Sequence, residues 1–202
     1  SYYYSIAHLG VNVAILIQYL APTLLVALEL AMGRWVGWSM IAAVACALAG
    51  TAMLVGGVDV RAIGAGPLQW AVGFSSALSF AFYIKASKRG LERYHPATVL
   101  FYTFMIAAFF WAIRTPPWTI AAAGFGPDLW AMFVALGIFS TLVPFSLFYA
   151  GLRSLPAAEA GVIATAEPLL VIVAAAVFLG ERLGPLQLVG ALFVLVAALV
   201  AS

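Results

Sequence analysis

Long apolar runs, each separated from the next by a short polar turn, constrain this chain more than any single motif. A membrane-spanning helix needs about 20 mostly apolar residues. Seven runs approach that length, at residues 11–31, 38–57, 67–87, 97–113, 129–151, 158–179 and 186–201. None alternates polar and apolar residues as a barrel strand does, and all are too long for one. The pattern predicts an all-α, polytopic transmembrane helical bundle with the lipid bilayer as its solvent.

The composition excludes several other classes of protein. Hydrophobic residues make up 66% of the 202 residues and charged residues only 8%, whereas a soluble domain carries about 25% charged residues. The net charge of +2 comes from scattered basic residues and does not indicate nucleic-acid binding. Cys46 is the one cysteine, so no intrachain disulfide can form. No phosphate-binding loop of the GxxxxGK[ST] type occurs, so ATP-driven transport by this chain is not supported.

The charges in the turns predict an orientation. Six basic residues follow the odd-numbered runs and three follow the even-numbered runs. The first set is Arg34, Lys85, Lys88, Arg89, Arg93 and Arg153, and the second is Arg61, Arg114 and Arg182. Because positive loops stay on the cytoplasmic side, we expect the odd turns and the C-terminus in the cytoplasm. Glu29 and Lys85 lie near the ends of their runs, where we expect them to act as topological anchors.

A glutamate beside a proline, Glu167-Pro168, lies inside an apolar run, where both residues are costly. Ala21-Pro22 is a weaker copy of it 146 positions earlier. The same offset superimposes Tyr3 on Tyr149, Leu9 on Leu155 and Ala14 on Ala160. The two prolines are five runs apart, and an odd offset means that the two copies cross the membrane in opposite directions. The chain is therefore predicted to contain an inverted-topology repeat, as many transporters do.

The first repeat is predicted to be incomplete. In the alignment, residues 1–8 correspond to the last turns of the run that ends before Leu155. We therefore expect seven full spans and the end of an eighth, and we expect the chain to be a fragment.

The second half resembles the EamA-like domain of the drug/metabolite transporter superfamily. The resemblance is carried by Glu167-Pro168, then Leu179-Gly180-Glu181-Arg182-Leu183, Gln187 and Gly190, with Tyr149-Ala150-Gly151-Leu152 before them. It implies a fold of ten helices in two inverted five-helix repeats. Residues 1–57 would be the C-terminal part of the first repeat and residues 67–201 a complete second repeat. In the first repeat Ala21 replaces the glutamate, so the resemblance leaves open whether the two halves contribute equally to a site.

The resemblance also implies a location and a set of partners. We expect an integral protein of a bacterial inner membrane, with a cytoplasmic C-terminus, that moves amino acids, metabolites or small drugs. The expected partners are lipid, a small-molecule substrate and, if a carboxyl titrates during transport, a coupling proton. The resemblance leaves open whether the chain forms a homodimer. No cofactor and no metal site are expected.

Glu167 is the first candidate for a functional residue, about nine residues into its run. A carboxyl near mid-membrane costs a few kcal/mol. It can face a cavity and carry a proton or bind a substrate ammonium. Alternatively, it can be structural and satisfy backbone groups that Pro168 leaves unpaired. Pro22 and Pro168 are interpreted as kinks that let their helices bend during gating.

Other polar side chains are candidates for lining a substrate path. Gln18 lies one turn before Pro22, and Tyr3 and Tyr149 are equivalent in the two halves. Ser76, Ser79 and Tyr83 share one face by their spacing. Each also has an ordinary explanation, because hydroxyl and amide side chains often form hydrogen bonds between transmembrane helices.

Three functions remain for comparison. A secondary transporter that works by alternating access is favoured by the repeat, the kinks and the few mid-membrane polar groups. An intramembrane enzyme would need a nucleophile–base pair or a metal cluster, but His8 and His95 lie near the ends of runs without such partners in a span, so we expect no enzyme. A non-transporting assembly or regulatory subunit, or an inactive fragment, stays open because the first repeat is incomplete.

Overall fold

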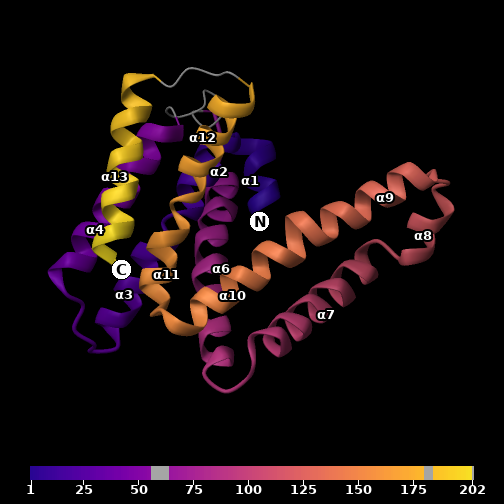
Figure 1. The fold of residues 1–202 in the computed structure, drawn as a ribbon, viewed down its shortest axis with the longest axis horizontal. Helices are drawn as coiled ribbons and strands as arrows, with labels where there is room; N and C mark the ends of the chain where they lie inside the picture. Colours follow the sequence, from indigo (N-terminus) through magenta and orange to yellow (C-terminus); the bar gives the residue numbers. More distant parts are fainter. Residues whose placement is uncertain (56–63, 180–183, 202) are drawn as a thin grey trace. The chain divides into compact units, whose positions relative to one another are not determined.

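The computed structural model describes residues 1–55, 64–179 and 184–201 and consists of helices joined by short turns. The described part contains no β-strand, which confirms the predicted all-α class. Figure 1 shows the helices coloured along the chain. Residues 1–85 and 156–202 form one compact unit, unit 1, and residues 86–155 form a second, unit 2.

Proline sets many of the helix boundaries, because its missing N–H is not needed in a first turn. Unit 1 contains α1 (Tyr2–Leu9), α2 (Val11–Gln18), α3 (Ala21–Ala31), α4 (Trp38–Val55), α11 (Ala157–Ala164), α12 (Glu167–Leu179), α13 (Pro185–Ala201) and most of α6 (Pro67–Leu91). Unit 2 contains the end of α6, then α7 (Pro96–Arg114), α8 (Pro117–Ala122), α9 (Pro127–Ala135), η1 (Leu136–Leu142) and α10 (Val143–Ser154). The element η1 is a π-helix that ends two residues before Pro144. A proline at this place cannot continue the regular α-helical hydrogen bonds.

Within the described residues, five helical stretches are long and apolar enough to cross a membrane. They are Val11–Ala31, Trp38–Val55, Pro96–Arg114, Pro127–Ser154 and Ala157–Phe178. The sequence predicted seven spans, and the other two predicted runs also lie on helices. One is α13, a shorter apolar helix of 17 residues. The other is α6, which is 25 residues long but carries serines and basic residues and is not among the five.

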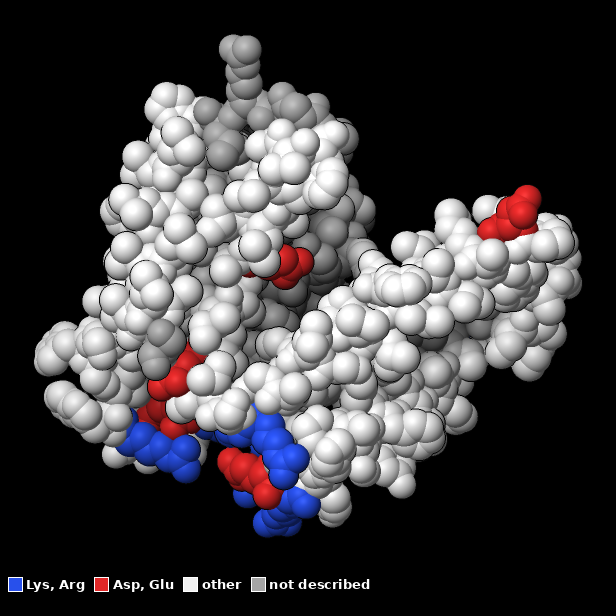
Figure 2. Space-filling view, in the orientation of Figure 1, with Lys and Arg blue, Asp and Glu red and all other residues white. Residues whose placement is uncertain are grey.

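The surface fits a lipid solvent. Most of the face shown in Figure 2 carries no Lys, Arg, Asp or Glu. Large apolar side chains are exposed along the helices, for example Phe82 at 73% and Phe178 at 84%. A water-soluble monomer rarely exposes wide apolar patches. The exposed apolar helices therefore confirm the prediction of an integral membrane protein.

The helix bounds match closely at the offset of 146 that the sequence comparison gave. Adding 146 to the bounds of α2 gives residues 157–164, which are the bounds of α11. The start of α3 falls on the start of α12, and α4 falls on residues 184–201, which differ by one residue from α13. The local structure around the two prolines is thus alike in both halves of the chain.

Helices α4 and α13 form the most extensive helix contact and run antiparallel (Figure 1). Gly190 lies against Gly50 and Leu54, while Ala197 and Ala201 pack in one cluster with the N-terminal part of α4. A Cβ on Gly50 would lie 2.7 Å from the Gly190 carbonyl oxygen, and one on Gly190 would lie 2.8 Å from the Gly50 oxygen. Small residues are what allow two backbones to approach this closely in a membrane.

We predict that Gly190→Ala destabilises unit 1, because the added methyl group would clash with backbone rather than with a flexible side chain. Overpacking of this kind costs about 1–3 kcal/mol. The purified protein in detergent should therefore melt at a lower temperature. Gly151→Ala in α10 is the matched control, because a Cβ at that position meets nothing within 4 Å. Equal melting temperatures for both variants would show that the close α4–α13 contact does not exist.

Candidate functional site

Two interrupted helices lie at the centre of unit 1. The helix that begins as α2 is broken at Tyr19-Leu20 before it continues as α3, and α11 is broken at Thr165-Ala166 before it continues as α12. The cause is local in both places. Pro22 and Pro168 have no N–H to donate to the carbonyl four residues before, at Gln18 and Ala164.

The two breaks share one hydrogen-bond pattern. The Leu20 N–H donates to the Ile17 oxygen at 3.0 Å, and the Ala166 N–H donates to the Ile163 oxygen at 3.0 Å. Both are tight i to i−3 bonds in place of the ordinary helical ones. At Thr165 the buried hydroxyl also donates to the Val162 carbonyl at 2.6 Å. These bonds pair carbonyls beside each break, at Ile17, Val162 and Ile163, and not the Gln18 and Ala164 carbonyls that lose the proline donor.

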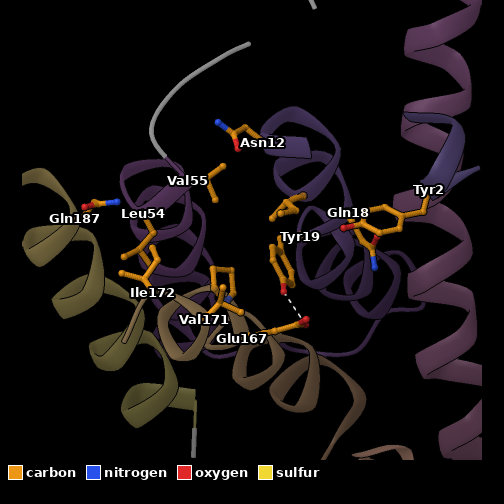
Figure 3. Close-up of a pocket in the computed structure, with 12 residues that line it drawn as sticks. Tyr2, Asn12, Gln18, Tyr19, Leu54, Val55, Glu167, Val171, Ile172 and Gln187 are labelled. Atoms are coloured by element: carbon orange, nitrogen blue, oxygen red, sulfur yellow. Dashed lines mark hydrogen bonds between the residues drawn. The ribbon is translucent and has the colours of Figure 1, made fainter. Parts of the chain in front are cut away.

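A side-chain hydrogen bond joins the two breaks. The Tyr19 hydroxyl donates to Glu167 Oε2 at 2.9 Å, across 148 positions in the sequence (Figure 3). The Tyr19 side chain is buried, at 7% exposed. A hydrogen bond to a charged acceptor is worth about 1.5–3 kcal/mol. The carboxyl predicted to be functional is thus held by a residue at the other break.

On one side of this bond the helices are packed together. Gly161 in α11 lies against α3, where a Cβ on the glycine would be 3.3 Å from Leu25 Cδ1 and 3.4 Å from Pro22 Cγ. Val26 and Val162 belong to the same buried cluster. Ordinary van der Waals contact therefore closes the space between α3 and α11.

On the other side α2 and α12 border a cavity of about 350 Å³. Its polar and charged lining residues are Tyr2, Asn12, Gln18, Tyr19, Glu167 and Gln187, drawn in Figure 3. The apolar lining is Ile15, Leu54, Val55, Pro168, Val171 and Ile172. Small-molecule sites have this character, with mostly apolar walls and a few placed polar groups, at volumes of about 300–1,000 Å³.

The packed side and the cavity correspond to each other at the offset of 146. Gly161, Pro22 and Leu25 make the packed side, and their counterparts Ile15, Pro168 and Val171 line the cavity. Two locally similar helix pairs therefore differ in arrangement. One pair is closed and its counterpart is separated around an open space.

Among the described residues of the lining, Glu167 is the single carboxylate, and none of them is a lysine, arginine or histidine. The Gln18 Oε1 atom is buried and forms no hydrogen bond within the described part of the chain. The Gln187 Oε1 atom, in contrast, accepts from the Gly184 N–H at 2.9 Å and caps α13. The site thus offers hydrogen-bond acceptors and one negative charge.

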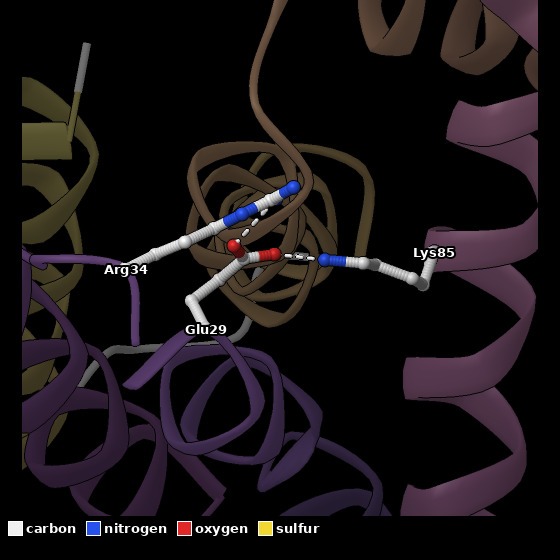
Figure 4. Close-up of polar contacts among 3 residues, drawn as sticks. All are labelled: Glu29, Arg34 and Lys85. Carbon is white, nitrogen blue, oxygen red and sulfur yellow. Dashed lines mark hydrogen bonds and ion pairs between the residues drawn. The ribbon is translucent and has the colours of Figure 1, made fainter. Parts of the chain in front are cut away.

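A separate charge cluster lies at the end of α3 (Figure 4). Glu29 Oε2 accepts from the Arg34 guanidinium at 2.9 Å, and Glu29 Oε1 pairs with the Lys85 ammonium on α6. An acidic residue in the last turn of a helix is disfavoured by the helix dipole. Two cations compensate it here, so this carboxylate is already satisfied and ties α3 to α6. None of the three residues lines the cavity.

The structure brings together some of the predicted site residues. Glu167, Gln18 and Pro168 line the cavity, and Pro22 lies on the packed side. Tyr3 is exposed at 77%. Tyr149 belongs to unit 2, where its hydroxyl donates to Thr103 Oγ1 at 3.2 Å and also pairs with Ser87 at 3.1 Å.

The predicted serine stripe on α6 does not line this cavity. Ser76 is buried and donates to the Gly73 carbonyl of its own helix at 2.7 Å. Ser79 is exposed and Tyr83 is half-buried. These residues, with Tyr3 and Tyr149, stay predicted path residues without a place in the cavity.

Sequence reasoning missed Tyr2, Asn12 and Tyr19 in the lining. Of these, Tyr19 makes the hydrogen bond to Glu167. The feature of the sequence that could have indicated it is its position beside Gln18, just before Pro22. The Gly180–Leu183 part of the predicted motif lies outside the described residues. Among the described residues, no three His, Cys, Asp or Glu side chains gather as a metal site would require.

Comparisons with known proteins agree with this membrane architecture. Residues 69–202 match the model of the EamA-like transporter family. The chain is 27% identical over 201 residues to an uncharacterized transporter of Archaeoglobus fulgidus, covering all of this chain and 70% of that protein. It is 34% identical over 137 residues to the threonine/homoserine exporter RhtA of Escherichia coli K12, covering 65% of this chain.

The chain spans less than half, 44%, of the length of that exporter. A solved crystal structure superimposes on all of this chain with a TM-score of 0.76 and 22% identity, and this chain covers 70% of it. At that identity the likeness shows the fold alone. The family match covers most of the chain and rests on the half that holds Glu167-Pro168. The chain belongs to the EamA-like transporter family.

Proposed function

We propose that this chain acts in a secondary transporter that moves a small organic solute by alternating access, and that the solute binds in the cavity beside Glu167. The solute would be a metabolite, an amino acid or a drug-like molecule. The observation that carries the proposal is the pair of corresponding helix breaks, one packed and the other open around a cavity with a single carboxylate.

Alternating access needs two arrangements of similar stability, which a duplicated unit provides. In the present arrangement α3 packs on α11 while their counterparts α12 and α2 border the cavity. Exchanging the roles of the two helix pairs would close the cavity and open a space on the opposite side. The breaks at Pro22 and Pro168 supply the bending points, because the backbone there is already released from regular helix bonds.

The proposal includes an orientation of the chain in the membrane. The basic turns that follow the odd runs, including those with Arg34 and Lys85, would lie in the cytoplasm of a bacterial inner membrane. The C-terminus would lie on the same side. The packed α3 end with its Glu29 cluster then faces the cytoplasm, and the cavity opens toward the other side of the membrane.

Glu167 would couple a proton to transport. A carboxyl in an apolar membrane interior favours its neutral form when unpaired. Here the Tyr19 hydroxyl donates a hydrogen bond to Glu167. The other described lining residues with an ionisable side chain are the phenols Tyr2 and Tyr19, so Glu167 is the one carboxyl among them. A pH response between acidic and neutral conditions would therefore come from Glu167.

Covalent blocking of the cavity tests the solute site. Val171 lines the cavity and is 61% exposed, whereas Val177 is on the same helix, is 70% exposed and does not line it. In a Cys46→Ala background, Val171→Cys labelled with a bulky maleimide should lower threonine flux in proteoliposomes at least tenfold. Threonine is the probe because relatives are named for exporting it.

Val177→Cys, labelled in the same way, should retain its flux. If both labelled variants lose flux equally, or neither does, the cavity is not the solute site. A chain that carries no threonine flux before labelling would favour the alternative of a non-transporting subunit or inactive fragment.

Glu167→Gln tests the coupling. The amide keeps the size and the ability to accept from Tyr19 but cannot titrate. We expect threonine flux to change with pH in the unaltered protein and to become independent of pH in the variant. Glu159→Gln is the matched control, because Glu159 lies at the start of α11 and does not line the cavity. A pH response that survives in Glu167→Gln would leave Glu167 a structural role only.

A further inference from the structure

We infer that the Glu29–Lys85 ion pair is a latch that holds the packed side of unit 1 closed. In this role it favours the arrangement in which α3 lies on α11 and the cavity beside Glu167 is open. The inference concerns the regulation of the proposed solute site, and it rests on the proposed alternating-access mechanism. It assigns a conformational function to a charge cluster whose residues are not part of the cavity lining.

The ion pair lies close to the residues through which α3 packs on α11. Leu25 lies against Gly161, and Val26 shares a buried cluster with Val162. Glu29 follows Leu25 and Val26 by about one helical turn, on the same uninterrupted helix. Holding Glu29 in place therefore also holds the two packing residues against α11.

The partner of Glu29 lies on a helix other than α11. Lys85 is on α6, which packs through Ala77 in a buried cluster with Leu9 of α1 and Ile17 of α2 (Figure 4 shows the ion pair). The packed position of α3 is thus fixed in two ways, by van der Waals contact with α11 and by an ion pair to α6. Under the proposed mechanism, the pair breaks when α3 moves away from α11.

Glu29 depends on its cations. It lies near the C-terminal end of α3, where the helix dipole disfavours a negative charge. The side chain of Glu29 is 19% exposed and that of Lys85 30%, whereas that of Arg34 is 62% exposed. Solvent and salt screen a sheltered ion pair less than an exposed one. Loss of Lys85 should therefore weaken the latch more than loss of Arg34.

The position of Glu29 has no charged counterpart in the second half of the chain. At the offset of 146 it corresponds to Ala175 in α12, which cannot form an ion pair. The ion pair therefore stabilises the arrangement in which α3 is packed, and the corresponding position of α12 adds no equal contribution to the reverse arrangement. An interaction that is made in one of two arrangements shifts their populations toward that one.

Two cysteine reporters at corresponding positions measure the arrangement. Leu25 is buried on the packed side, at 1% exposed, and its counterpart Val171 lines the cavity. Each is replaced by cysteine in a Cys46→Ala background, and the purified chain in lipid nanodiscs is labelled with a water-soluble maleimide. With the latch intact, we expect Val171→Cys to react faster than Leu25→Cys.

Lys85→Gln should change the two labelling rates in opposite directions. Leu25→Cys should react about threefold faster or more, which is the population shift expected from losing one partly exposed ion pair, and Val171→Cys should react more slowly. Lys85→Arg keeps the charge and should restore both rates. Arg89→Gln is the matched control, because Arg89 is an exposed base one turn further along α6 and does not belong to the Glu29 cluster.

Two results would overturn the latch. One is that Lys85→Gln leaves both rates unchanged. The other is that both reporters react faster, because local unfolding exposes the two sides together and a shift between arrangements does not. If Leu25→Cys does not fold, Val162→Cys replaces it, since Val162 is fully buried in the packed cluster and cysteine is close to valine in size.

The threonine flux of labelled Val171→Cys separates the latch from the function on which it rests. If the latch is overturned and labelling still blocks flux, the proposed solute site stands without this form of regulation. If labelling leaves flux intact, the proposed solute site fails, whichever way the labelling rates change in Lys85→Gln.

Discussion

The requirement that every backbone N–H and C=O in lipid finds a partner governs this structure. It makes the chain helical throughout its described apolar runs, and it makes the two helix breaks the exceptional places. Pro22 and Pro168 each remove a donor, and each break contains a tight i to i−3 bond, from the Leu20 N–H to Ile17 and from the Ala166 N–H to Ile163. A break in lipid is tolerated where protein or a cavity surrounds it. Both conditions occur here, with Gly161 packed against Pro22 and the cavity against Pro168.

The helices that correspond at the offset of 146 show two arrangements of one repeated unit. The α3–α11 pair is packed, and its counterpart, α12 and α2, borders the cavity. Bounds of α2 and α11 coincide at the offset of 146, and the antiparallel α4 and α13 are held together through Gly50 and Gly190. In the glycine contact, backbone lies close to backbone. The α3–α11 contact is made by side chains and a proline ring instead. Under the proposed mechanism, α4 and α13 would therefore form the frame, and the broken helices would be the elements that move.

The sequence predicted the fold class because hydrophobic length and composition alone limit a chain in lipid to few architectures. It also singled out Glu167 and Gln18 as candidates for a substrate path, because an ionisable or amide side chain in an apolar run must find a protein or water partner. Both line the cavity, and their role in transport stays a prediction. Sequence reasoning missed Tyr19 and Tyr2, since tyrosine is an ordinary residue in membrane helices and pairing over 148 positions leaves no periodic signal. Ser76, Ser79 and Tyr83 were predicted to line a path because their spacing places them on one helical face. A serine hydroxyl can also bond to its own helix, and Ser76 does so.

Two carboxylates of unit 1, Glu29 and Glu167, show how environment assigns roles to one side-chain type. Glu29 lies at the unfavourable end of a helix and is neutralised by Lys85 and Arg34, so it has little remaining attraction for a solute. Glu167 lies at the start of α12, where the helix dipole favours a negative charge, and its partner is a neutral phenol. Tyr19 therefore positions this carboxyl without supplying a compensating cation. Because Ala21 takes its place in the other half, the carboxyl marks one of two similar breaks, and under the proposed function a solute bound beside it would meet an asymmetric site between two similar halves.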